Sequence, residues 1–410
     1  MIDLRTTGPG RAEIAGCPEC GALQRVMPSG DADILCYRCR TPVERAAGRS
    51  AGAALACALA ALLILFPANL LPVLRSRLLG ASLEAHVFDG AIAYWRDGWP
   101  LVATFVALFV VIIPFARSMM LVAVLGSLRL GRHGRWQGLL FRYVEDLRPW
   151  SLPAVYVLAG IVTYSRIAAQ LNIEILTGGW CFVFAALLLL VADASLDARR
   201  VWQEIRPQGP VRDISMDCDA CGLIVPTRME GARCPRCGRR LHERKPQSIS
   251  RTAALTAAAL VLYPIGIFLP MAHTIEPTGL VERSVVDGVM ELFAKGFWGF
   301  GVILFTFSIA IPLLKLIALG WLMLRIKYPR AKGLVLRTKI HRVLADINPW
   351  SFTDPFIVAL TIPLMSYPGI ADVHAGPGAL PFALIVVLTM LASRYFDTRL
   401  MWDAAEKTNA

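Results

Sequence analysis

Eight separate apolar runs of about membrane-spanning length constrain the fold of this chain more than any other feature. An α-helix needs roughly 20 apolar residues to cross the hydrocarbon core of a bilayer. Because 56% of the 410 residues are hydrophobic and only 18% are charged, we predict an all-α polytopic membrane protein with eight spanning helices. The runs occupy about residues 51–74, 99–128, 152–170, 178–198, 252–271, 297–324, 351–369 and 378–398.

The chain contains two copies of one layout, offset by about 200 residues. The matching motifs include Asp89-Gly90 with Asp287-Gly288, Pro114 with Pro312, and Pro149-Trp150-Ser151 with Pro349-Trp350-Ser351. We therefore predict a tandem duplication, and an even number of spans gives both copies the same orientation. The predicted parts are a first zinc ribbon, a first transmembrane module, a second zinc ribbon and a second transmembrane module at 11–45, 51–203, 211–244 and 250–403.

Eight of the ten cysteines form Cys-x-x-Cys pairs, two pairs before each module. Four thiolates at such spacing suit a tetrahedral Zn²⁺ ion, which supplies much of the folding energy of so small a unit. Iron in a rubredoxin-like site is the alternative, because Cys₄ spacing alone does not select the metal. The other two cysteines, Cys57 and Cys181, lie in apolar runs and are expected to be packing residues. The predicted ligands of the two ions are Cys17, Cys20, Cys36, Cys39, Cys218, Cys221, Cys234 and Cys237.

Basic residues between apolar runs predict the orientation. Five arginines lie in the segment 129–148, and seven Lys or Arg residues lie in 325–342. Because positive loops stay in the cytoplasm, the N-terminus, both ribbons and the C-terminus are predicted to be cytoplasmic. This placement accounts for the net charge of +12 without a nucleic-acid partner. The polar first fifty residues contain no secretion signal, and paired thiols are typical of a reducing compartment.

The segments 75–98 and 272–296 lie at the opposite, outer side in this orientation. We expect amphipathic helices there, lying in the membrane interface. Tyr94, Trp95 and Trp99 are then expected to belong to the aromatic belt.

Charged residues inside the second module mark a candidate functional site. Lys315 is about 15 Å inside its helix, and Asp354 is about 9 Å inside the next one. A charge at the centre of a spanning helix costs about 2.5–3.5 kcal/mol. Pro312 is expected to leave the carbonyl of Ser308 without its helical partner. The predicted polar network comprises Lys315, Asp354, Ser308, Ser351 and Thr389, with Ser393 and Asp397 continuing the stripe of Thr389.

Two interpretations of this network remain open. It is either a structural ion pair that locks the helices together, or a protonation switch coupled to movement of the module. In the first module Arg117 replaces the lysine, but Ala154 stands at the position of the acid. Asp193 is expected to face Arg117 instead, so we expect the active network in the second module.

No pattern of a catalytic site is found in the chain. There is no phosphate-binding loop of the Walker type and no nucleophile elbow. All six histidines are expected in loops or at helix edges, which excludes a facing pair for a membrane haem. We therefore expect a protein that is not an enzyme.

The doubled ribbon and helix layout, together with Ile-Pro-Leu-Leu-Lys at 311–315 and Pro-Trp-Ser-Phe-Thr-Asp at 349–354, resembles the paraquat-inducible protein A family over about residues 15–403. Members commonly have Asp-Val-Phe where this chain has Asp-Pro-Phe, and Pro355 is expected to bend the start of its helix. The resemblance implies an inner-membrane partner of MCE-domain proteins, which form tunnels for phospholipids across the periplasm. It also implies a functional network of Ser308, Lys315, Ser351, Asp354 and Thr389.

The leading hypothesis is a subunit of an MCE-type phospholipid transport system. It loads or extracts lipids at the inner membrane, with a proton gradient acting through Asp354 and Lys315. One alternative is a scaffold that anchors the MCE partner without transporting lipid. Another is a redox protein that holds iron in the Cys₄ sites.

Overall fold

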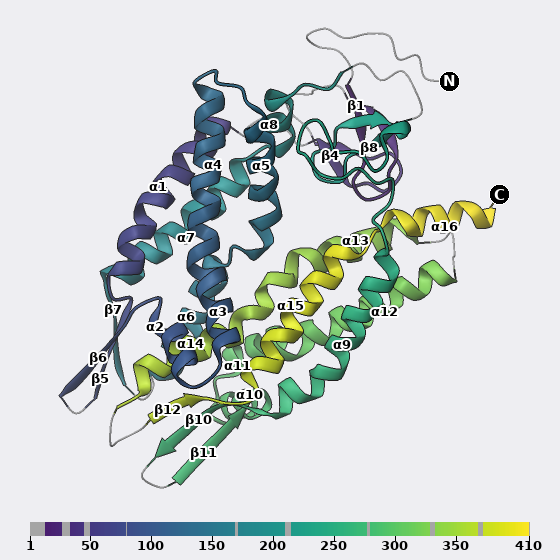
Figure 1. Cartoon of the computed structure of the whole chain (residues 1–410). Helices are drawn as coiled ribbons and strands as arrows, with labels where there is room; N and C mark the ends of the chain where they lie inside the picture. The colour runs from purple at the N-terminus through teal and green to yellow at the C-terminus, as the bar shows by residue number, and fades with distance from the viewer. Residues whose placement is uncertain are drawn as a thin grey trace.

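The computed structural model describes residues 13–26, 33–44, 50–78, 80–168, 171–209, 215–276, 279–328, 333–367 and 372–409. Within these ranges most residues are helical, and the strands form small antiparallel sheets. The two cysteine ribbons lie together at one end of the helices (Figure 1). Two three-stranded sheets lie at the other end (Figure 1).

The ribbons are built from short strands around the cysteine pairs. In the first ribbon β1 pairs with β2 and β3 pairs with β4, and in the second ribbon β8 pairs with β9. The strands are β1 (Glu13–Gly16), β2 (Leu23–Val26), β3 (Ile34–Leu35), β4 (Pro42–Glu44), β8 (Ser215–Asp217) and β9 (Ile224–Pro226). A 3₁₀ turn, η3 (Thr227–Met229), follows β9.

The two helical parts of the described chain contain the same kinds of element in the same order. The first part has α1 (Ala51–Leu70), β5 (Leu74–Leu78), β6 (Ala81–Ala85), α2 (Asp89–Arg96), α3 (Pro100–Ala107), η1 (Leu108–Ile112), α4 (Ile113–Arg129), α5 (Arg135–Leu147), η2 (Arg148–Trp150), α6 (Pro153–Ile167), β7 (Asn172–Ile175), α7 (Thr177–Ser195) and α8 (Ala198–Ile205). The second part has α9 (Ser248–Phe268), β10 (Pro270–Glu276), β11 (Gly279–Ser284), α10 (Val285–Ala294), α11 (Trp298–Leu304), η4 (Phe305–Ala310), α12 (Ile311–Lys327), α13 (Leu334–Ile347), η5 (Asn348–Phe352), α14 (Thr353–Met365), β12 (Asp372–Ala375), α15 (Ala379–Tyr395) and α16 (Arg399–Asn409).

Among the described residues, five helices are long and apolar enough to cross a membrane, namely α1, α3 to α4, α7, α9 and α11 to α12. A sixth candidate is α15 with α16, which are bent by 48° relative to one another. The apolar runs 152–170 and 351–369 form α6 and α14, which have 15 and 13 residues. A span usually needs about 17–25 residues. Eight spanning helices therefore stay a prediction.

The segments 75–98 and 272–296 begin with β-hairpins, so the prediction of amphipathic helices is wrong for their first halves. In the first hairpin, Ser76 is buried and Arg75 points outward to Glu84, directly opposite on β6, at 2.6 Å. Alternation of this kind is the period of a strand. The mixed charges of the segment are cross-strand pairs, which stabilise a sheet.

Only part of the predicted aromatic belt lies on the surface. Trp95 is 63% exposed, whereas Tyr94 is completely buried and donates a hydrogen bond to the carbonyl of Pro355 at 3.1 Å. The indole of Trp99 donates to the carbonyl of Ala375 at 3.2 Å. One face of α2 is thus part of the core, because it packs on α14 of the other half.

The segments predicted as basic loops contain helices. Segment 129–148 includes α5, and segment 325–342 includes most of α13. Both helices are amphipathic, with Phe141 and Val144 of α5 and Leu344 of α13 buried. They lie beside the cysteine ribbons (Figure 1).

Helices α6 and α14 cross at the centre of the core. The rings of Tyr156 and Phe356, which are 200 residues apart, pack edge to face with centroids 5.5 Å apart. Close by on α14, Ala359 contacts α2 so tightly that a Cβ on Gly90 would lie 2.4 Å from its carbonyl oxygen. The two halves therefore share one hydrophobic core.

Candidate functional site

Each ribbon brings its four cysteine sulfurs into one buried cluster. Within each cluster all four sulfur atoms lie within 4.8 Å of one another. Four thiolates at about 2.3 Å from a tetrahedral ion are about 3.8 Å apart. Among the sulfur pairs, Cys17 and Cys39 are 3.4 Å apart, and Cys20–Cys36, Cys218–Cys237 and Cys221–Cys234 are each 3.6 Å apart. The donor sets fit a Zn²⁺ ion or an iron ion.

The Cys-x-x-Cys pairs lie in turns of one kind. In the first turn, the N–H of Gly21 donates to the carbonyl of Cys17 at 2.9 Å. The residue after the second cysteine of each pair has a positive φ, which favours glycine because it has no Cβ. These residues are Gly21, Arg40, Gly222 and Gly238. The backbone thus aims both thiols of a pair at one point.

The apolar core of each ribbon packs against the helical part that it does not precede. Cysteines of the first ribbon cluster with Trp402, in the second half. Cysteines of the second ribbon cluster with Phe141 and Trp202, in the first half. A Cβ on Gly138 would lie 1.9 Å from the carbonyl oxygen of Arg236, so this contact is close. The ribbons therefore link the two halves crosswise.

A buried ion pair at this junction is missing from the sequence-based predictions. Arg399 of α16 donates two hydrogen bonds to Asp217 of the second ribbon, at 2.9 and 2.8 Å. Its Nε also donates to the carbonyl of Pro18 in the first ribbon at 3.2 Å. The recurring Asp-x-Arg-x-x-Trp sequence at 197–202 and 397–402 is the signal that marks this junction.

Asp397 lies outside the polar stripe predicted for the last long helix. Helix α15 ends at Tyr395, and Asp397 accepts a hydrogen bond from the N–H of Arg399 at 3.1 Å. Its other oxygen accepts from the N–H of Lys245 at 3.0 Å. The prediction for Asp397 is therefore wrong, because the chain turns before reaching it.

The structure brings Lys315 and Ser351 of the predicted network together. Lys315 is 1% exposed, and its ammonium donates to Ser351 Oγ at 2.7 Å and to the carbonyl of Asn348 at 3.3 Å. Both acceptors belong to the 3₁₀ turn η5, where Pro349 follows the end of α13. This turn presents polar atoms to α12, which is part of a candidate membrane span.

The other predicted network residues are buried on neighbouring elements. Asp354 is 6% exposed in the first turn of α14. The Thr389 hydroxyl donates to the carbonyl of Val386 in its own helix at 3.0 Å. Ser308 is 1% exposed, and its hydroxyl has no hydrogen-bond partner within the described part of the chain. A direct contact between Lys315 and Asp354 stays a prediction.

A π-helical segment precedes Pro312 and changes which carbonyl loses its donor. The N–H of Ile311 donates to the carbonyl of Thr306, five residues earlier. Pro312 has no N–H. In this register, that N–H would have donated to the carbonyl of Phe307 rather than to the carbonyl of Ser308. Such segments occur frequently at functional sites. An equivalent segment, η1, precedes Pro114 in the first half.

Asp354 lies near α2 of the other half. Burial raises the pKa of Tyr94, and the negative charge of Asp354 acts in the same direction. Pro355 lies in the first turn of α14, where its missing N–H removes no helical hydrogen bond. A bend at the start of the helix stays a prediction.

The first half holds an ionic cluster of its own. Arg117 is 3% exposed and donates two hydrogen bonds to Asp193, one of them at 3.2 Å, which confirms the prediction that they face each other. Arg117 also donates to the carbonyl of Val144 at 3.1 Å. Burial raises the pKa of the neighbouring Glu145. This arrangement differs from that around Lys315, where a serine is the side-chain acceptor.

His341 is buried inside α13, so its predicted position in a loop or at an edge is wrong. Its Nε2 donates to the carbonyl of Ser393 at 3.2 Å, and Nδ1 is 3.9 Å from Glu19 Oε2 in the first ribbon. Burial lowers the pKa of His341, although Glu19 acts in the opposite direction. The residue connects the first ribbon to α15.

Comparisons with known proteins give one family. The family model described as paraquat-inducible protein A matches residues 52–206 and 249–406. The chain is 26% identical over 403 residues to intermembrane transport protein PqiA of Escherichia coli strain K12, covering 94% of this chain and 95% of that protein.

Two further relatives also match over nearly the whole length of the chain. Lipophilic envelope-spanning tunnel protein A of the same strain is 28% identical over 405 residues, covering 98% of this chain and 93% of that protein. A probable intermembrane transport protein of Haemophilus influenzae is 26% identical over 410 residues, covering 96% and 97%. No solved structure matches the chain.

Proposed function

Because the chain belongs to the paraquat-inducible protein A family, we propose that it is an inner-membrane subunit of a phospholipid transport system. It loads or extracts phospholipids at the membrane and exchanges them with a periplasmic tunnel of MCE-domain proteins. The observation that carries this proposal is Lys315, held at 1% exposure within the spanning helix α12. The intermembrane transport named in its relatives supports the same conclusion.

The proposed architecture is a tandem duplication with eight membrane helices, in which α6 and α14 are the short members. The recurring order of elements and the packing of α6 on α14 support it. The ribbons and the C-terminus are proposed to be cytoplasmic, because the basic segments lie at their end of the molecule. The proposed boundaries are 11–45, 51–203, 211–244 and 250–403.

Proton movement is the proposed energy input. An ammonium buried in a spanning helix is costly, and the oxygens of Ser351 and Asn348 compensate only part of that cost. A change of charge at Lys315 or Asp354 would therefore alter how α12 holds the start of α14. Because α14 packs between the two halves, such a change would move the halves relative to one another. Ser308 and Thr389 would supply the remaining polar groups.

The two cysteine clusters are proposed to hold one Zn²⁺ ion each. Four thiolates leave no open coordination position, so the ions would act as structural elements of the ribbons. Iron in the same thiolates is the alternative, and it would favour a redox function. Metal analysis of the purified protein and its visible absorption distinguish the two.

The test of this function is the variant Asp354→Asn. Phospholipid transfer is measured between donor vesicles containing the chain with its MCE-domain partner and acceptor vesicles. We expect transfer to stop while the amount of folded protein is unchanged. Asp346→Asn is the matched control, because Asp346 is exposed on α13 and lies outside the network. Normal transfer by the Asp354 variant would overturn the proton role.

A scaffold that only anchors the MCE-domain protein is the second candidate. It is favoured by the two oxygen partners of the Lys315 ammonium, which are typical of a structural tie between helices. In that case Asp354→Asn lowers the yield or the thermal stability. The protein that survives would then transfer lipid as well as the wild type does.

A further inference from the structure

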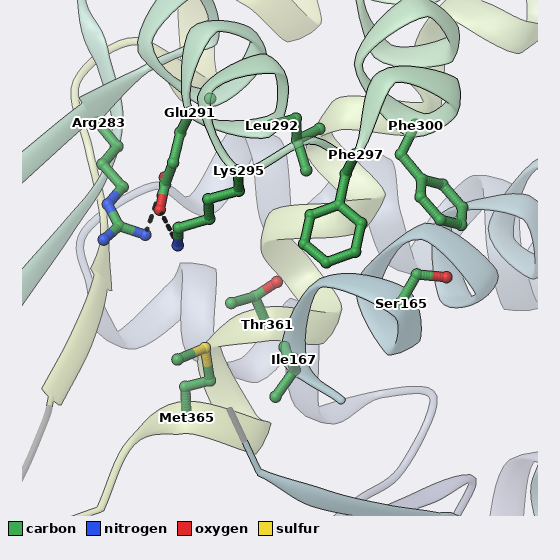
Figure 2. A pocket seen from close by; sticks show the side chains of 11 residues that line it. Ser165, Ile167, Arg283, Glu291, Leu292, Lys295, Phe297, Phe300, Thr361 and Met365 are labelled. Carbon is green, nitrogen blue, oxygen red and sulfur yellow. Dashed lines mark hydrogen bonds and ion pairs between the residues drawn. The ribbon is translucent and has the colours of Figure 1, made fainter. Parts of the chain in front are cut away.

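A small cavity lies between the two halves, at the end that carries the three-stranded sheets. Helix α6 of the first half forms one side, and β11, α10, α11 and α14 form the rest (Figure 2). Its volume is about 120 Å³. Sites for whole small molecules usually occupy about 300–1,000 Å³. The cavity therefore suits one polar group of a larger ligand.

The cavity lies on one of two related sides of the α6–α14 pair. On the filled side, the hydroxyl of Tyr367 lies 2.8 Å from Ser76 Oγ, which also donates to the carbonyl of Leu364 at 2.7 Å. On the other side, the residue that corresponds to Tyr367 in the repeat is Ile167, 200 residues earlier, and it lines the cavity. An isoleucine is shorter than a tyrosine and cannot donate such a hydrogen bond.

The glycines at these two sides support the same comparison. Gly90 of α2 is in tight contact with Ala359 of α14. Gly288, its counterpart in the repeated Asp-Gly motif, lines the cavity on α10. Helices α2 and α14 are thus in direct contact at Gly90. At the corresponding place between α10 and α6, the cavity lies beside Gly288.

One wall of the cavity carries an excess of positive charge. Lys295 and Arg283 both pair with the single carboxylate of Glu291, at 2.6 and 3.4 Å (Figure 2). Their side chains are 49% and 43% exposed, so they remain accessible to a ligand. Two cations that share one carboxylate keep a net positive charge, which suits a phosphate group.

The remaining walls combine hydroxyl groups with apolar side chains. Thr361 donates its hydroxyl proton to the carbonyl of Ile357 at 2.7 Å, and Ser165 donates to Ile161 at 2.8 Å. A hydroxyl has one proton, so the Thr361 oxygen is left as an acceptor toward the cavity, whereas the Ser165 oxygen points away from it (Figure 2). A ligand group with a hydrogen-bond donor can therefore bind to the Thr361 oxygen.

Apolar surface continues from the cavity along α11. Phe297 lines the cavity, and Trp298 and Val302 beyond it are 66% and 53% exposed. Helix α11 begins a candidate membrane span, so these side chains face the hydrocarbon region of the bilayer. Acyl chains can lie there while a headgroup occupies the cavity.

We propose that the cavity binds the phosphodiester headgroup of a phospholipid whose headgroup carries hydrogen-bond donors, as ethanolamine and glycerol do. Lys295 and Arg283 bind the phosphate oxygens, and Thr361 accepts from the headgroup. Choline is disfavoured, because its quaternary ammonium has no donor. This inference rests on the proposed transport of phospholipids, and it names the class of lipid that the cavity binds.

The experiment measures binding of short-chain lipids to the full-length protein in detergent by native mass spectrometry. The probes are dihexanoyl phosphatidylglycerol, the matching ethanolamine and choline lipids, and inorganic phosphate. The variants are Lys295→Gln and Glu291→Gln. Lys339→Gln is the control, because Lys339 is exposed on α13, away from the cavity.

We expect the glycerol and ethanolamine lipids to bind about tenfold more tightly than the choline lipid, the size of one good hydrogen bond. Lys295→Gln should weaken their binding by about tenfold. Glu291→Gln should strengthen it, because a competing carboxylate is removed. Opposite changes from two neutralising variants cannot come from damaged folding. The control should bind as the wild type does.

Three results would overturn the inference. Equal binding of the choline lipid removes the donor preference, and binding of inorganic phosphate as tight as that of the lipids indicates a free-phosphate site. Unchanged binding in Lys295→Gln removes the cavity as the site. Transfer between vesicles is measured in parallel, so normal transfer without cavity binding rejects this site and leaves the transport function standing. Cavity binding without any transfer rejects the transport function instead.

Discussion

The ammonium of Lys315 donates a hydrogen bond of 2.7 Å to Ser351 Oγ, which joins α12, part of a candidate membrane span, to the turn that leads into α14. Both side chains are 1% exposed. Because α14 packs against α2 and α6 of the other half, this hydrogen bond lies one helix away from the contact between the halves. It is therefore placed where a small polar change can affect the whole molecule.

Removing the serine hydroxyl should destabilise the protein more than removing the charge. Ser351→Ala leaves a buried ammonium with one acceptor fewer, at a cost of about 1–3 kcal/mol. Lys315→Met replaces the charge by an apolar chain of similar length, so no buried ammonium is left without an acceptor. The thermal midpoint in detergent measures both. A lower midpoint for Lys315→Met than for Ser351→Ala would contradict this view of the site.

The ion pair of Arg399 with Asp217 should be important for stability. Its side chains are 7% and 8% exposed, and breaking one partner of a buried pair typically costs about 3–5 kcal/mol. Asp217→Asn should therefore lower the thermal midpoint clearly. Glu406→Gln is the control, because the Glu406 side chain is 65% exposed and its pair with Arg38 should contribute at most about 1 kcal/mol. If both variants lowered the thermal midpoint equally, the ion pair of Arg399 with Asp217 would not be important for stability.

Loss of one metal site should loosen the half that its ribbon packs against. In Cys218→Ser the second ribbon is damaged, and amide hydrogen exchange should rise in α5 and α8 of the first half. In Cys17→Ser the effect should appear in α16 of the second half. The two variants are controls for each other. Increased exchange only in the half that directly follows each ribbon would disprove crosswise coupling.

The contact between His374 and Asp97 should depend on pH. The hydrogen bond of 2.9 Å to Asp97 raises the pKa of His374 above its usual 6.5. A raised pKa in the folded state means that this stabilisation is complete below pH 6.5 and is lost as the pH rises through the folded value. The thermal midpoint of His374→Gln should therefore approach that of the wild type at alkaline pH.

The sign of this effect is specific to His374. The buried His341 has a lowered pKa, so its contribution is lost as the pH falls. The comparison between the wild type and His374→Gln cancels the contribution of His341, which is common to both. A difference between the two proteins that grows as the pH rises would contradict the assignment.

Features carried by short stretches of sequence could be predicted. The apolar runs indicate a membrane protein, because every backbone polar group in a bilayer must be satisfied within helices or a closed barrel. The cysteine clusters follow from Cys-x-x-Cys spacing, and the pairing of Arg117 with Asp193 follows from the repeat. Lys315 stands out because a charge in an apolar run is costly.

Features that depend on distant partners could not be predicted. The strand that contains Arg75 is an exception, because the alternation of Arg75 and Arg77 with buried residues has the period of a strand, which the prediction of an amphipathic helix overlooks. Hydropathy also does not show that α14 has only 13 residues and is buried by protein along most of its length. The pair of Arg399 with Asp217 joins residues 182 positions apart, and the Asp-x-Arg-x-x-Trp repeat that contains Arg399 does not identify Asp217 as its partner.

The most direct test of the central claim is purification of the tagged chain from native membranes together with an MCE-domain protein, followed by lipid analysis of the complex. We predict a stable complex that contains phospholipid and that keeps its composition in Asp346→Asn. A preparation with neither an MCE-domain partner nor bound phospholipid would contradict the transport function.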